Sequence, residues 1–309
     1  MKFINLCRLP ALGLLSLSLL AAPVNAGDDV GLAIVPFAVA SLTRNFPAGL
    51  RTALTGSQFA QHVARMNSRE REKAILKEIL GGNLPSFLTK LIPVALNYRQ
   101  PDGRNITATI FVMPEYLAIG SDRDFLRIPM NFYTAVAVAS RMGFILPTRK
   151  IVNAIHDQSA FHLSPEPMTA GPQMTSTEYY QTHNSKIEAQ SRTLGVTPGA
   201  LVSGDKKDVV VTKLLARNPG KIAIYGWHRL NGAPIQPLST VHGACYADYS
   251  HGIRLVSETV LVDGKARSVY DVLRDPVLSK VLSDEGPIPE VRALMTAPAG
   301  DSPCDRPSI

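Results

Sequence analysis

The stretch VALNYRQPDGRNITATIFV, from Val94 to Val112, decides which kind of fold this chain can adopt. Its two arms, residues 94–98 and 106–112, are rich in β-branched and other apolar residues. They flank Pro101-Asp102-Gly103, whose residue types are those that a tight turn requires. The stretch therefore predicts a β-hairpin.

Helical patterns lie on both sides of this hairpin. Before it, Asn67-Ser68-Arg69-Glu70 resembles a capping box that opens a helix through Leu80, where Gly81-Gly82 ends the pattern. After it, we expect one helix that starts at Asn131 or Thr134 and runs to Met142, and a second over 149–158. Tandem helices behind a hairpin indicate an α+β arrangement.

The second half of the chain has the character of strands. We expect strands over 208–213, 221–228, 253–256 and 259–262, a turn at Asp263-Gly264, and a short helix that Ser268 opens. The prediction is thus an α+β fold: a helical N-terminal half with a β-hairpin, and a C-terminal half mainly of strands that form a mixed or antiparallel sheet. The segment 163–177, rich in Pro, Gly, Ser, Thr and Met, reads as a long surface loop and a candidate lid.

The first 26 residues have the pattern of an export signal. Lys2 and Arg8 precede a short apolar run, and Val24-Asn25-Ala26 supplies the small residue of a cleavage site. The run is too short to span a bilayer core of about 30 Å as a stable anchor. We expect a signal peptide at 1–26 and a single exported α+β domain at 27–309, in which any subdivision would fall near 163–177. The location would be periplasmic or extracellular.

Charge excludes some classes of partner. The whole chain carries +7, and loss of Lys2 and Arg8 with the signal lowers this to +5. No run of five basic residues occurs and aromatic residues do not interleave with basic ones, so we expect no nucleic-acid partner. The partner would be an extracytoplasmic polymer or a small-molecule substrate.

Two cysteines, Cys245 and Cys304, remain after cleavage of the signal, which carries Cys7. An exported chain with two cysteines favours one disulfide between them, with two free thiols as the alternative.

The densest group of chemically active residues runs from Trp227 to Arg254. Three of the seven histidines of the mature chain lie in it. Period-two alternation along the predicted strand 221–228 places His228 at the strand tip, and residues 248 and 251 would converge in a turn. The candidate metal ligands are His228, His242, Asp248 and His251.

Such a set suits zinc with one open position, where bound water becomes a hydroxide nucleophile. Catalysis would then rest on His228, His251 and Arg254, whose guanidinium would hold a substrate carboxylate or an oxyanion. Zinc is the one cofactor we expect, although the chain contains no His-Glu-x-x-His motif. A structural role for His228 and His251 is the alternative.

The stretch Ser250-His251-Gly252-Ile253-Arg254 resembles the Ser-His-Gly-Cys-x-Arg signature of L,D-transpeptidases. His228 also lies upstream on a predicted strand, as the histidine of that family does. In this chain, however, Ile253 stands where the nucleophilic cysteine would be, and Cys245 is out of register. The resemblance covers five residues and does not supply that family's nucleophile.

Two further patterns concern other chemistries. Asp122 with Asp124, or Glu258 with Asp263, would serve as a glycosidase pair if their carboxyls lay about 5 to 9.5 Å apart. Residues 204–208 lack the glycine spacing of a phosphate-binding loop and read as a charged turn before a strand.

These observations together predict an exported hydrolase, metal-assisted if the histidines hold zinc, that acts on an envelope or extracellular polymer such as cell-wall peptide or glycan. The alternative is a non-catalytic secreted protein that binds a saccharide or peptide through Trp227, Tyr246 and Tyr249.

Overall fold

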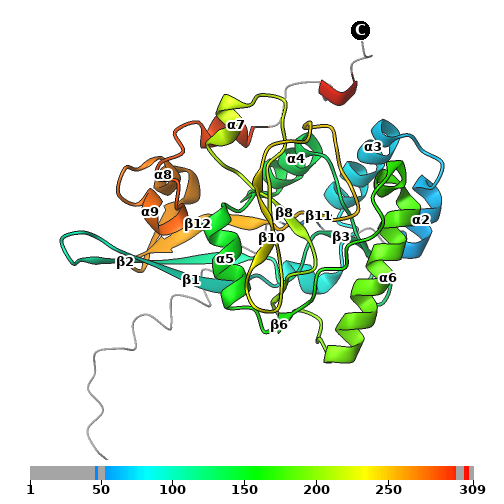
Figure 1. Ribbon diagram of the computed structural model, residues 1–309, viewed down its shortest axis with the longest axis horizontal. Helices are drawn as coiled ribbons and strands as arrows, with labels where there is room; N and C mark the ends of the chain where they lie inside the picture. The colour runs from blue at the N-terminus through cyan, green and yellow to red at the C-terminus, as the bar shows by residue number, and fades with distance from the viewer. Residues whose placement is uncertain (1–45, 48–52, 297–302, 306–309) are drawn as a thin grey trace, which may run out of the picture.

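The computed structural model describes residues 46–47, 53–296 and 303–305, and it confirms the α+β class. Figure 1 shows the β1–β2 hairpin projecting at one end, whereas helix α6 lies along the other end. The predicted signal at 1–26 lies outside the described residues. Among the residues described, no helix is both long and apolar enough to cross a membrane.

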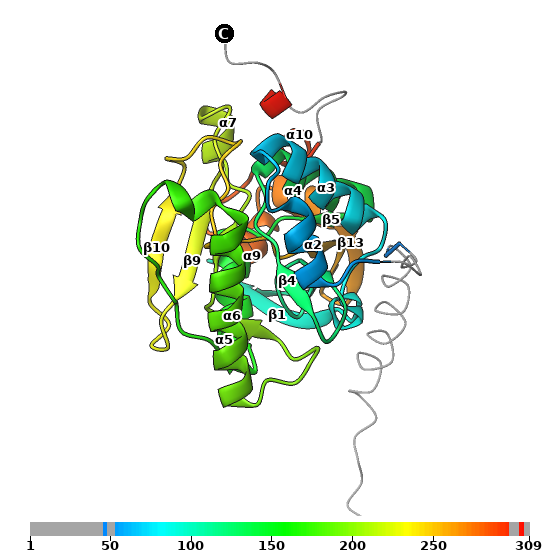
Figure 2. The same ribbon diagram turned by 90° about the vertical axis from the view of Figure 1, so that its right-hand side faces the viewer.

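The helices cover the strands from several sides. Figure 2 shows strands β9 and β10 on one flank and helices α2 and α3 on the opposite flank. The α-helices are α2 (Gly56–Val63), α3 (Ser68–Leu80), α4 (Phe132–Met142), α5 (Arg149–Asp157), α6 (Thr177–Leu194), α7 (Leu214–Arg217), α8 (Val269–Arg274), α9 (Ser279–Leu282) and α10 (Val291–Leu294). Short 3₁₀ turns are η2 (Ser86–Thr89), η3 (Pro172–Thr175) and η4 (Pro303–Asp305).

Most strands belong to two sheets. The first is antiparallel, with the order β1 (Ile92–Arg99), β2 (Asn105–Val112), β12 (Val256–Val262) and β13 (Lys265–Ser268), and β5 (Phe144–Ile145) also pairs with β12. The second is mixed, with the order β10 (Pro234–Ser239), β9 (Ile224–His228), β8 (Lys207–Val209) and β11 (His251–Gly252), the last pair being parallel. Two short pairs complete the set, β3 (Ala118–Gly120) with β4 (Phe125–Arg127) and β6 (Phe161–His162) with β7 (Val202–Ser203).

The predicted hairpin is confirmed as β1 and β2, with Val94 opposite Ile110 and Leu96 opposite Ala108. These four side chains are buried, so one face of the hairpin packs into the main hydrophobic core. That core draws on residues from Phe59 to Met295, and it therefore joins both halves of the chain.

Three of the predicted helices form with the expected ends. Asn67 caps α3 and Glu70 reaches back to the Asn67 amide, as the capping box requires. Asn131 caps α4, and Gly143 ends it in the left-handed conformation with φ 74°. The predicted helix at 149–158 is α5, which Thr148 caps.

Helix α6 is the largest element that the sequence analysis missed. Its buried positions follow helical spacing, but three of the five are polar: Thr177, Tyr180, His183, Ile187 and Ser191. The Ser176 cap and the left-handed Gly195 at the far end were the available signals.

Several strands have bounds that differ from the predicted ranges. The run 208–213 yields only β8. The predicted strand at 259–262 belongs to β12, which begins at Val256, so residues 253–255 of the other predicted strand lie outside it. The segment after Gly232 forms β10. The turn at Asp263-Gly264, with φ values of 47° and 75°, matches the prediction.

Cys245 and Cys304 lie at disulfide distance, in agreement with the pairing that the sequence favours. The bond connects the segment between β10 and β11 to the C-terminal tail.

Candidate functional site

A tight turn brings together two of the predicted site residues, Asp248 and His251. The His251 amide donates to the Asp248 carbonyl over 3.0 Å, and the Ser250 amide donates to Asp248 Oδ1 over 2.8 Å. This is the way in which an aspartate commonly closes a turn on its own backbone. Strand β11 begins at His251 directly after the turn, and His251 pairs there with Lys207 of β8.

The imidazole of His251 is fully buried, yet neither ring nitrogen has a hydrogen-bond partner among the described residues. Its Nε2 lies 3.8 Å from Asp248 Oδ2. Burial lowers the pKa of His251 to about 4, although Asp248 acts in the opposite direction. The ring is therefore neutral at pH 7 and has a free lone pair.

The pKa of Asp248 is shifted downward overall. Burial alone would raise it, but His251 and the hydrogen bonds from Ser250 more than offset that effect. The pair is thus an ionised carboxylate next to a neutral imidazole.

Two further residues cover this pair. The ring of His242 stacks on Tyr246 with 4.4 Å between centroids, and the Tyr246 hydroxyl donates to Asp248 Oδ2 over 3.1 Å. The centroids of His242 and Tyr246 lie 6.2 and 5.8 Å from that of His251. We refer to Lys207, His242, Tyr246, Asp248 and His251 as the His251 cluster.

Lys207 contributes the cation of the His251 cluster. Its Nζ lies 5.0 Å from the ring centroid of Trp227, and partial burial lowers its pKa while Asp248 raises it. Trp227 itself has φ 54°, a left-handed conformation that costs a bulky residue of order 1–3 kcal/mol. Strain of this kind is concentrated at functional sites.

Beneath the cluster lies a buried amine that the sequence analysis did not select. Lys206 Nζ donates to the Tyr249 carbonyl over 2.6 Å and contacts His183 Nδ1 at 3.0 Å. Burial lowers the pKa of Lys206 to about 7, and burial with the nearby Lys206 amine also lowers the pKa of His183. The segment 204–208 is a charged turn that leads into β8, as predicted, and its Asp205, Lys206 and Asp208 are buried.

The candidate lid closes over the same region. The Met168 amide donates to the Tyr249 hydroxyl over 2.7 Å, and the Tyr249 amide donates to the Met174 carbonyl over 3.0 Å. The segment 163–177 thus packs on Tyr249 next to the His251 cluster.

His228 lies elsewhere. Left-handed φ values at Gly226 and Trp227 break the period-two alternation on which its placement was based, and His228 contacts helix α5. Its ring stacks on His156 at 4.5 Å and its Nε2 lies 3.2 Å from Asn153 Oδ1. We refer to Asn153, His156, His162, Ser203 and His228 as the His228 cluster, in which His156 Nδ1 contacts Ser203 Oγ at 3.0 Å and His162 packs at 4.4 Å from His156.

The predicted ligand set is therefore divided between two clusters. His242, Asp248 and His251 lie together, whereas His228 does not share their site. Among the residues that the structure describes, no group of three or more His, Cys, Asp or Glu side chains is arranged to hold a metal ion. The zinc site stays a prediction.

Arg254, predicted to bind a substrate carboxylate or an oxyanion, lies in the interior of the fold. Its side chain is 1% exposed, and its two terminal nitrogens donate to the carbonyls of Met113 and Val202 over 3.0 and 2.6 Å. The guanidinium also packs 4.3 Å from the ring centroid of Tyr116. Arg254 thus joins three segments of the interior and does not face solvent.

The remaining candidate catalytic residues also pack or form hydrogen bonds within the fold. Ile253, at the position of the L,D-transpeptidase cysteine, is buried in the main core. The carboxylate pairs bind separate neighbours: Asp122 accepts from Ser86, Asp124 from Ser57, Glu258 from Tyr270 and Asp263 from Thr107.

The chain matches no family model, no curated protein and no solved structure.

Proposed function

We propose that this protein is an exported hydrolase in which His251 is the general base and Asp248 the carboxylate that orients it. The observation that carries the proposal is the buried imidazole of His251, which has no partner on either nitrogen and lies 3.8 Å from Asp248. A buried polar group without a partner is costly, and such groups persist where a reaction uses them.

The chemistry follows from the geometry. Asp248 faces Nε2 and favours the tautomer with its proton there, which leaves Nδ1 free to accept a proton from water. The water oxygen attacks the carbonyl carbon of the substrate, and the imidazolium that forms is stabilised by Asp248. His251 then returns the proton to the leaving group as the bond to it breaks.

Lys207 is the candidate for stabilising the oxyanion of this reaction, since it pairs with His251 across β8 and β11. His242 and Tyr246 cover His251, so a substrate must displace this stacked pair. The substrate class that we propose is an extracytoplasmic polymer such as cell-wall peptide, whose amide carbonyl this mechanism attacks.

The binding-protein alternative relied on aromatic contact surfaces. Trp227 and Tyr249 are buried, and only Tyr246 of the three is partly exposed. This observation favours the hydrolase over a binder that uses these rings.

The test compares wild type with His251→Gln on two dye-labelled polymers, insoluble peptidoglycan and casein. We expect release of soluble dye from at least one polymer, and a loss of about 10²- to 10⁴-fold in kcat for the variant, the usual contribution of a general base. Activity of the wild type should fall as the pH drops through about 4, because His251 becomes protonated there.

His62→Gln, at an exposed position of α2, is the matched control and should retain full activity. Chelation separates the two ways of activating water: EDTA abolishes activity if zinc is required and leaves it intact if His251 acts alone. No release from either polymer, with wild-type protein retained on the insoluble cell wall, would instead support the binder.

A further inference from the structure

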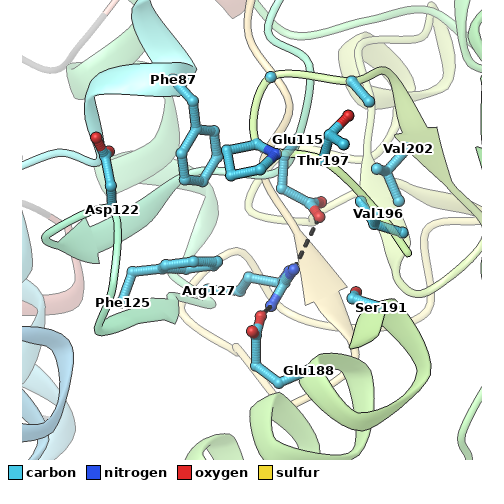
Figure 3. Close-up of a pocket in the computed structure, with 13 residues that line it drawn as sticks. Phe87, Glu115, Asp122, Phe125, Arg127, Glu188, Ser191, Val196, Thr197 and Val202 are labelled. Carbon is cyan, nitrogen blue, oxygen red and sulfur yellow. Dashed lines mark hydrogen bonds and ion pairs between the residues drawn. The ribbon is translucent and has the colours of Figure 1, made fainter. Parts of the chain in front are cut away.

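A separate pocket of about 130 Å³ lies between β4, α6 and the segment 196–200. Figure 3 shows the rings of Phe87 and Phe125 on one side of it and Val196 and Val202 on the other. The two rings lie 5.3 Å apart in an edge-to-face arrangement. The walls therefore suit a small apolar group.

Charged side chains form the remaining wall. Arg127 makes ion pairs with Glu115 at 2.9 Å and with Glu188 at 2.6 Å, so one cation faces two carboxylates. Asp122 adds a further negative charge at the rim, while the buried neighbours Asp205 and Lys206 offset each other. The pocket is thus net negative.

Two acceptors in this wall are left over. Ser191 Oγ is buried and has no hydrogen-bond partner among the described residues, and Figure 3 shows this hydroxyl at the edge of the pocket. Glu188 uses Oε1 for Arg127, and in the described part of the chain no bond engages its Oε2. Residues 188 and 191 are three positions apart on α6, so both side chains lie on one face of the helix.

We propose that this pocket binds a primary ammonium group on a short apolar stem, of the kind that a lysine side chain presents. The ammonium donates to Glu188 and to Ser191, and the stem packs between the rings of Phe87 and Phe125 and the two valines.

An anionic ligand does not fit the same wall. Both terminal nitrogens of Arg127 already donate to Glu115, Glu188 and Asn184, and the side chain is 3% exposed. The proposal also goes beyond the proposed hydrolase, because binding here involves no residue of the His251 cluster and is measured without turnover.

The experiment titrates the whole protein with Nα-acetyl-lysine methylamide and, separately, with its Nε-acetylated form, followed by NMR chemical shifts. We expect saturable binding of the free amine, weakened by added salt, and none of the acetylated form, which lacks the charge. Glu188→Gln and Ser191→Ala should each weaken binding roughly tenfold, as expected for loss of one hydrogen bond to a charged group.

Ser191→Ala removes a hydroxyl that has no partner, so the folded protein should keep its unfolding temperature and the loss of affinity then reports on the site itself. Glu178→Gln, an exposed carboxylate on the same helix, is the control and should bind like wild type. Equal binding of the two compounds, no saturation by the free amine, or unchanged affinity in both pocket variants would each overturn the proposal.

Discussion

Burial is the main cause of the shifted pKa values of several side chains in this protein. His228 and His251 both have a pKa lowered to about 4, chiefly because burial disfavours the charged ring. Burial acts in the opposite direction on the carboxylic acids Glu72 and Asp208 and raises their pKa to about 7. As the pH falls, protonation of the buried histidines lowers the free energy of unfolding, whereas protonation of the buried acids raises it. Variants of one residue at a time are needed to separate the two effects.

The His228 contribution has a definite sign. In the unfolded chain a histidine binds its proton near pH 6.5, whereas folded His228 binds it only near pH 4. Its contribution to stability is therefore complete above pH 6.5 and is lost as the pH falls toward 4. His156 and His162 add to the shift, since a second charge in the stack would repel the first.

Denaturant unfolding from pH 4 to 8 measures this contribution as the difference between wild type and His228→Gln. We expect that difference to be constant above about pH 7 and to move in favour of the variant below 6.5. His62→Gln, at an exposed position, is the control for the replacement of a histidine as such. A flat difference for His228→Gln would contradict the burial argument.

At the scale of elements, the caps determine where the helices begin. Thr55, Asn67, Asn131, Thr148 and Ser176 each accept a hydrogen bond from the backbone at the start of their helix. Of the described helices before the hairpin, α3 is more polar than α2, since it buries Arg71 and Glu72 beside Ile75 and Ile79. We therefore expect its cap to contribute to its stability.

Asn67→Ala removes both the Asn67 side-chain acceptor and the geometry of the capping box. We expect it to lower the free energy of unfolding by about 1 kcal/mol, measured by urea denaturation. Ser68→Ala, at the adjacent exposed position, should change stability by only a few tenths as a control. Equal losses in both variants would mean that the cap does not stabilise α3.

At the scale of the whole molecule, the Cys245–Cys304 disulfide closes a loop of 59 residues. It holds the segment that carries His242 and Tyr246 against the C-terminal tail, so it acts on the fold and on the cover of His251 together. The sequence alone favours this disulfide but is also compatible with two free thiols.

Replacing both cysteines by serine should lower the free energy of unfolding by up to about 4 kcal/mol in the loop-entropy account. Denaturant unfolding of the double variant measures this, and wild type in reducing agent provides the comparison. Unchanged stability in both samples would show that the tail contributes little to the folded state.

The sequence by itself determined the parts of this protein that local rules control. The hairpin at 94–112, the Asn67 capping box, the Gly143 stop and the turn at Asp263-Gly264 follow from residue types a few positions apart. The meeting of Asp248 and His251 in a turn also followed from their spacing of three residues.

Only the tertiary structure decided the rest. The sequence analysis grouped His228 with His251 in one ligand set, but the left-handed backbone at Gly226 and Trp227 interrupts the strand alternation, and His228 packs on His156 in the His228 cluster. Arg254 resembled a substrate-binding cation until its carbonyl partners, 141 and 52 positions away, placed it in the interior. Helix α6 was hidden because its buried face carries His183 and Ser191, which only long-range packing can bury. Local rules fix where elements turn and end, whereas burial by distant segments fixes which polar side chains meet.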